Sequence, residues 1–132
     1  AEPLVWILHA AFAWLPLALL LAGLAGLWPE AVPPAAALHG FAAGSLSSMT
    51  MAVMTRAILG HTGRPLAAGA GTLAIYLLIL AAGGLRVAAA FPSAWQTALL
   101  GVAGAAWIAA FGAFLLLYGP LCLRPRPDRR PG

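Results

Sequence analysis

The chain has 132 residues, of which 63% are hydrophobic and 8% are charged, and its formal net charge is +4. A soluble domain of this size carries about 25% charged residues, so the composition excludes a water-soluble enzyme or binding module. All seven basic residues are arginines, and four of them fall within the last nine residues. This clustering is typical of a tail at a membrane surface and predicts no nucleic-acid partner.

Four apolar stretches are long enough to cross a membrane. A span needs about 20 mostly apolar residues to cross a hydrocarbon core of about 30 Å. The predicted transmembrane helices are residues 4–28, 35–59, 66–90 and 94–123. The chain is therefore predicted to be an all-α, multi-pass membrane protein surrounded by lipid. Because it starts without methionine and enters a span almost at once, we expect a piece of a longer or processed protein.

The first span carries His9 about one and a half turns from its start. An ionisable residue inside a membrane is costly and therefore points to function, and imidazole is the usual neutral ligand of haem iron and copper. The alternative is a histidine that hydrogen-bonds a neighbouring helix or lines a wet crevice. Trp14, deeper in the same span, is predicted to have a packing role.

The second span has a ridge of small residues spaced by four, at Gly40, Gly44, Ser48 and Ala52. Such a ridge lets a neighbouring backbone approach closely, which predicts a central helix with more lipid-exposed outer spans. At about 100° per residue, His39 points away from the ridge, and Met54 lies within about 60° of the direction of His39. Both could bind haem iron, since a thioether is a known ligand, although core packing is the alternative for Met54.

His9 and His39 enter the membrane from opposite faces. The helix rise separates their depths by on the order of 15 to 20 Å, so one metal cannot bind both. His61, in the loop after the second span, is on the same side as His9, which makes a shared site possible. A solvated or helix-capping histidine is the alternative for His61.

The loop between the second and third spans has Gly60 placed to end a helix and Pro65 placed to begin one. Near the far end of the third span, Arg86 is close in depth to His39. It could extend its guanidinium to the interface, or it could pair with a haem propionate, since arginine forms paired hydrogen bonds with carboxylates.

The last span holds Trp107, predicted to pack, and Cys122, which is interpreted as a small hydrophobic residue. The arginines flanking the spans set the orientation, because basic residues stay in the cytoplasm. The number of arginines on each side of the spans places both termini and the loop at residues 60–65 on the cytoplasmic side. The tail, residues 124–132, is rich in arginine and proline and is predicted to be disordered.

Residues 37–66 read ALHGFAAGSLSSMTMAVMTRAILGHTGRPL. An early histidine, a small-residue stretch, a Met-Thr-Arg ending and a Gly-His-Thr-Gly-Arg loop resemble the most recognisable segment of the NnrS family. The flanking segments VWILHAAFAWLPLALLL and LRVAAAF are similar to that family as well. The resemblance implies a bacterial inner-membrane protein of about a dozen spans, of which this chain supplies roughly the last third.

The same resemblance implies haem b and copper as cofactors, and a role in nitric oxide metabolism and resistance to nitrosative stress. Nitric oxide or a nitrosyl species and the remaining N-terminal spans are the implied partners. Our hypothesis places His39 at haem, with Arg86 at a propionate and Met54 nearby, and His9 with His61 at copper. The alternative is a cofactor-free transporter segment or structural subunit.

Whether the protein catalyses a reaction stays open at this point. Binding nitric oxide, carrying electrons and relieving iron nitrosylation would use the same residues. The predicted spans contain no Asp or Glu, because Glu2, Glu30 and Asp128 all lie at the termini or in a loop. A reductase needs proton delivery, so this absence favours sequestration or electron transfer, and it argues against a proton-coupled transporter.

Overall fold

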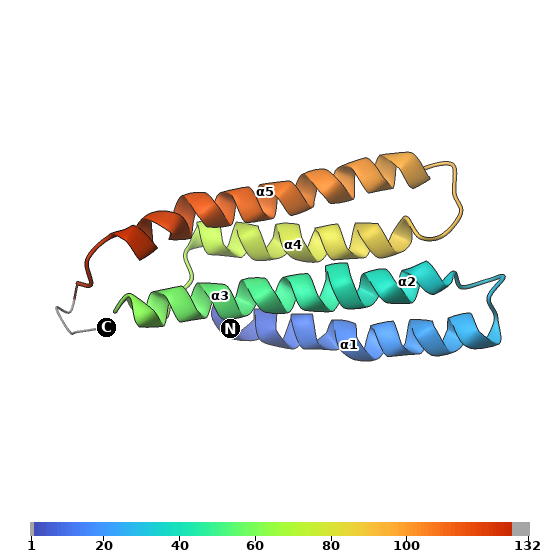
Figure 1. Cartoon of the computed structure of the whole chain (residues 1–132), viewed down its shortest axis with the longest axis horizontal. Helices are drawn as coiled ribbons and strands as arrows, with labels where there is room; N and C mark the ends of the chain where they lie inside the picture. The colour runs from blue at the N-terminus through green and yellow to red at the C-terminus, as the bar shows by residue number, and fades with distance from the viewer. Residues whose placement is uncertain (1, 128–132) are drawn as a thin grey trace.

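The structure is a computed structural model that describes residues 2–127, and within that range it is helical without strands. Its elements are α1 (Pro3–Leu27), α2 (Pro34–His39), the π-helix η1 (Gly40–Leu46), α3 (Ser47–His61), α4 (Ala70–Ala88) and α5 (Gln96–Leu123). The elements α2, η1 and α3 follow one another without a break (Figure 1). Helices α1, α4 and α5 have the length and apolar composition to cross a membrane, so this is an all-helical membrane protein.

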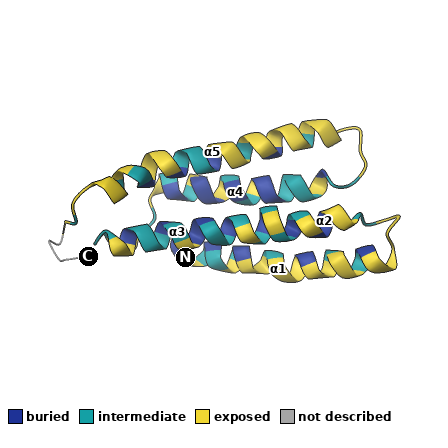
Figure 2. Ribbon diagram, viewed as in Figure 1, coloured by how far each residue is buried: buried dark blue, intermediate teal, exposed yellow. Residues whose placement is uncertain are grey.

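Seen from the side, the helices follow the order α1, α2–α3, α4 and α5 (Figure 1). The arrangement is staggered, because α1 also contacts α4 and α5 also contacts α3, so that α2–α3 and α4 both lie inside. The segment α2–α3 packs against α1 and α4, while the described parts of α1 and α5 do not touch. Buried residues gather between the helices and exposed ones on the outer faces of α1 and α5 (Figure 2). The prediction that the second span is central, with exposed outer spans, is confirmed.

The ridge predicted on the central segment is buried at all four positions. On the α1 side, a Cβ added at Gly44 would lie 2.5 Å from Cδ2 of Trp14, which confirms the packing role of that tryptophan. On the α4 side, a Cβ added at Gly83 would lie 2.9 Å from the carbonyl oxygen of Ala43. Glycines therefore bring neighbouring helices into close contact with both sides of the central segment.

Seven residues of the central segment, Gly40–Leu46, form a π-helix. Its i→i+5 hydrogen bonds make wider turns than those of an α-helix, and such turns occur often at functional sites. The hydroxyl of Ser47 follows the same spacing, donating to the carbonyl of Ala42 at 2.9 Å. Side-chain directions predicted at 100° per residue are therefore not valid across this segment, which lies between His39 and Met54.

A Schellman motif ends α3, and it involves a different glycine from the one expected. The amide of Gly63 donates to the carbonyl of Gly60 at 3.2 Å, and that of Arg64 donates to Leu59 at 2.9 Å. Gly63 has φ 68°, the left-handed conformation that this motif requires. The assignment of the helix end to Gly60 was therefore wrong, because Gly60 still lies within the last turn of α3.

The helix α4 begins at Ala70 and not at Pro65. The four residues before it are not helical, and Gly69 is extended with φ −83° and ψ 177°. The carboxylate of Glu2, just before α1, accepts a hydrogen bond from the amide of Ala68 at 3.0 Å. This bond satisfies the Ala68 amide outside a helix, which explains why α4 starts later than the third predicted span.

We expect Gly63→Ala to destabilise the protein by about 1–2 kcal/mol, because a side chain with a Cβ is disfavoured in the left-handed region. The matched control is Gly60→Ala, since a Cβ there meets nothing within 4 Å and alanine favours a helix. Unfolding in detergent by titration with a denaturing detergent measures both. Equal stabilities of the two variants would contradict the role given to Gly63.

The contact of α4 with the central segment gives a second prediction. Gly83→Ala should cost about 1–3 kcal/mol of unfolding free energy, because the added methyl group would overlap the backbone of η1. Gly84→Ala, next along the same helix, adds its methyl group to open space and should be neutral or stabilising. The same unfolding titration compares them, and a Gly83→Ala protein as stable as the wild type would disprove the close contact.

Candidate functional site

A cavity of about 420 Å³ lies between the central segment, α4 and α5. Two charged or ionisable side chains line it, His39 from the last position of α2 and Arg86 from the last turn of α4. The expectation that these two residues lie at the same depth is confirmed. The other lining residues are small or apolar: Ala43, Ala82, Ala103, Gly104, Trp107 and Ile108.

The cavity exists because α5 leaves the central segment at this end. Within the described residues, α5 packs against α4 and reaches α3, but it does not contact α2 or η1. Small residues on the facing surfaces, such as Ala43, Ala82 and Gly104, leave the space between the helices unfilled. Its volume falls in the range of about 300–1,000 Å³ that is usual for small-molecule sites.

The cavity combines a side chain that can bind a metal with a cationic side chain that can bind a carboxylate. His39 and Arg86 are both partly buried, and no carboxylate within residues 2–127 lines the cavity. Imidazole can bind a metal through one nitrogen, while a guanidinium can hold a carboxylate through paired hydrogen bonds. The lining is mostly apolar, which would strengthen both interactions where a bound group displaces water.

The contribution of α5 to this site was not predicted from the sequence. Trp107 was assigned a packing role, and its ring does pack against Phe111, with centroids 4.3 Å apart, but it also lines the cavity. Ala103, Gly104 and Trp107 lie on one face of α5 at helical spacing. That spacing, at the depth of His39 and Arg86, is the signal that could have identified them.

Met54 does not reach the cavity. It packs against the buried cluster of apolar residues in the other half of the bundle, on α3. It follows His39 by 15 residues, which corresponds to roughly 20 Å along a helix. The expected proximity of Met54 to His39 is therefore corrected, because the prediction weighed direction around the helix and not the distance along it.

His9 and His61 lie at the opposite end of the bundle from the cavity. His9 is exposed on α1, and its Nδ1 donates to the carbonyl of Val5 at 3.0 Å. This bond leaves Nε2 of the neutral ring with its lone pair. His61 is the exposed last residue of α3, and its carbonyl accepts a hydrogen bond from Arg126 at 3.0 Å.

No group of three or more His, Cys, Asp or Glu side chains within residues 2–127 is arranged to hold a metal ion. Any metal bound by His9, His39 or His61 would therefore need further ligands of another kind or from elsewhere. Cys122, near the end of α5, is exposed. Residues 128–132 of the predicted disordered tail lie outside the described residues.

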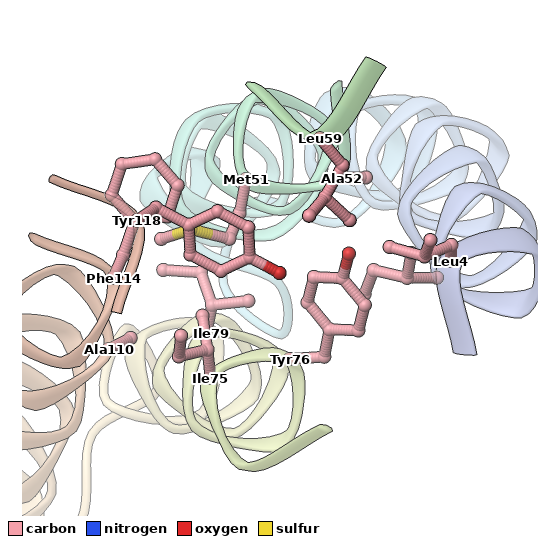
Figure 3. Close-up of a cluster of buried hydrophobic side chains, with 11 residues drawn as sticks. Leu4, Met51, Ala52, Leu59, Ile75, Tyr76, Ile79, Ala110, Phe114 and Tyr118 are labelled. Atoms are coloured by element: carbon pink, nitrogen blue, oxygen red, sulfur yellow. The ribbon is translucent and has the colours of Figure 1, made fainter. Parts of the chain in front are cut away.

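Two buried hydroxyl pairs were also missed by sequence analysis. Thr55 of α3 pairs with Tyr76 of α4, and Thr72 of α4 pairs with Tyr118 of α5 at 2.7 Å. Figure 3 shows both tyrosine rings inside the bundle among apolar side chains. These pairs link adjacent helices by polar contacts away from water. Tyrosine and threonine inside predicted spans were the available signal.

The Thr55–Tyr76 pair gives an asymmetric prediction. In Tyr76→Phe, the Thr55 hydroxyl keeps its bonds to the carbonyls of Met51 and Ala52, so we expect a cost of about 0.5–1.5 kcal/mol. In Thr55→Val, the buried phenol loses this partner and the cost should be about 1–3 kcal/mol. Unfolding titrations in detergent test the order, and a reversed order would refute this assignment of partners.

The fold and the site define an all-helical membrane protein with a histidine–arginine cavity between three helical segments. The protein-family model described as NnrS protein matches residues 1–126. The chain therefore belongs to the NnrS family, which confirms the resemblance found in its sequence. No curated protein and no solved structure matches the chain.

Proposed function

We propose that this chain is part of a haem- and copper-containing protein of the bacterial inner membrane that acts in nitric oxide metabolism and resistance to nitrosative stress. Membership of the NnrS family supports this role. The observation that carries it to specific residues is the shared cavity of His39 and Arg86. A haem group requires a ligand for its iron and a cationic partner for its propionate carboxylates, and this largely apolar cavity offers a candidate for each.

The residues of the cavity fit haem b in kind. His39 would bind the iron, and Arg86 would pair with a propionate, since the lining residues in the described part of the chain offer it no carboxylate. Ala43, Ala82 and Gly104 leave room for a flat ring, and Trp107 presents an aromatic wall. Bound here, haem would supply an iron centre able to bind nitric oxide or a nitrosyl species.

His9 and His61 are proposed to contribute to a separate copper site at the other end of the bundle. The bond from His9 Nδ1 to the Val5 carbonyl supports this role for His9, because metal-binding histidines usually donate their second nitrogen to such an acceptor. Its exposure on α1 means that a neighbouring span could reach it. We propose that the remaining N-terminal spans of the same protein supply the other ligands.

The proposed topology has four spans with both termini in the cytoplasm. The uninterrupted helical residues 34–61 would form the remaining span beside α1, α4 and α5, since 28 residues exceed the roughly 20 that a crossing needs. The start of α1 and the end of α5 lie at one end of the bundle, which accords with an even number of crossings (Figure 1). Arg56, Arg64 and the tail arginines favour the cytoplasm for that end.

Binding of nitric oxide or transfer of electrons suits these residues better than its reduction. Reduction also needs protons, and none of the described residues that line the cavity is a carboxylate that could relay them. Binding needs only a ligand for the iron and control of access, which His39, Trp107 and Ile108 could provide. We therefore propose a sequestering or electron-transfer role.

An optical spectrum and a metal analysis of the full-length protein, purified in mild detergent, test the proposal. We expect a Soret band that is lost in His39→Ala and kept in His9→Ala and His61→Ala, because only His39 lies at the cavity. Copper content should fall in His9→Ala or His61→Ala and persist in His39→Ala. A folded wild type with neither cofactor would refute the proposal and favour a cofactor-free transporter segment or structural subunit.

The role of Arg86 is tested by a matched pair of variants. Arg86→Gln should retain haem about 10- to 100-fold more weakly, since a charge-assisted hydrogen bond contributes about 1.5–3 kcal/mol. Arg86→Lys keeps the charge and should lose less. Equal haem retention in Arg86→Gln and the wild type would exclude a propionate partner here while leaving the test of His39 intact.

A further inference from the structure

A second cavity lies on the outer surface between α1 and α3, at the end of the bundle where α1 starts and α3 ends. Its volume is about 380 Å³, and it is lined by Leu8, Val53, Arg56, Ala57, Gly60 and Leu66. The guanidinium of Arg56 is the only charged group among these residues, and the remaining walls are apolar or glycine. This groove is separate from the His39–Arg86 cavity and shares no lining residue with it.

We propose that this groove binds an anionic phospholipid, with the phosphate at Arg56 and an acyl chain along Leu8 and Val53. Arg56 precedes the last residue of α3 by five positions, which corresponds to about 7.5 Å of helix. A guanidinium at that depth lies near the boundary between headgroups and acyl chains, where basic pockets between helices bind lipid phosphates.

The hydrogen bonding of Arg56 prepares it for this role. Its Nη1 donates to the carbonyl of Leu4 at 3.3 Å, which anchors the partly buried side chain between α1 and α3. A guanidinium has several further N–H groups in a fixed plane, and their geometry matches phosphate oxygens. The mouth of the groove is open as well, because a Cβ at Gly60 would meet nothing within 4 Å.

The charge of this end of the bundle favours an anionic headgroup over a zwitterionic one. Arg64 and Arg124 lie at the same end as Arg56, at the end of α3 and directly after α5. Glu2 adds one negative charge at this end, which its carboxylate keeps while it accepts the Ala68 amide, but these three arginines outnumber it. The surrounding potential is therefore positive and draws acidic lipids to this end of the bundle, while the direct contact at Arg56 would select between headgroups.

Native mass spectrometry of the full-length protein in mild detergent, titrated with phosphatidylglycerol or phosphatidylcholine of the same acyl chains, tests the proposal. We expect the wild type to bind phosphatidylglycerol about tenfold more tightly, a difference of about 1.4 kcal/mol. Arg56→Gln should remove this preference, Arg56→Lys should keep part of it, and the exposed control Arg124→Gln should change it less than about twofold.

A second pair of variants tests the groove itself. Ala57→Phe fills the groove and should weaken the binding of both lipids, whereas Ala109→Phe, on an exposed face of α5, should not. If Arg56→Gln proves too unstable to purify, Ala57→Phe and Arg56→Lys decide the question. Equal affinity for the two lipids in the wild type, or equal losses in Arg56→Gln and Arg124→Gln, would overturn the proposal and leave only a diffuse attraction of charge.

Discussion

Close contact of backbones around the central helical segment is the constraint on which the remaining structure depends. Gly44 makes room for the ring of Trp14 on one side, while Gly83 brings α4 against the backbone of η1 on the other. In a bilayer, lipid is as apolar as the helices, so association rests on such packing and on a few polar contacts. The buried hydroxyl pairs, Thr55–Tyr76 among them, supply the polar part.

This packing also determines where space remains. Because α4 is held against η1, α5 can pack on α4 while diverging from the central segment, and the cavity with His39 and Arg86 forms in the gap. The π-helix directly after His39 changes the rotational phase between that residue and α3. The site and the contact that holds the bundle together are thus built from the same stretch of chain.

The two ends of the bundle differ in chemistry. One end holds the cavity of His39 and Arg86 within apolar walls. The other collects Arg56, Arg64 and the hydrogen bond from Arg126 to the His61 carbonyl, together with an open groove. The Gly-His-Thr-Gly-Arg loop of the family resemblance is a Schellman cap whose left-handed residue is Gly63, so part of that motif is explained by helix termination.

Hydropathy and small-residue spacing by themselves determined the helical membrane class, the central place of the second helix and the shared depth of His39 and Arg86, because these follow from length and the rise per residue. Only the tertiary structure decided that Trp107 joins the site, that Met54 does not, and that α4 starts at Ala70. A π-helix, the divergence of α5 and the bond from Glu2 to the Ala68 amide depend on contacts between distant segments, which local periodicity does not encode.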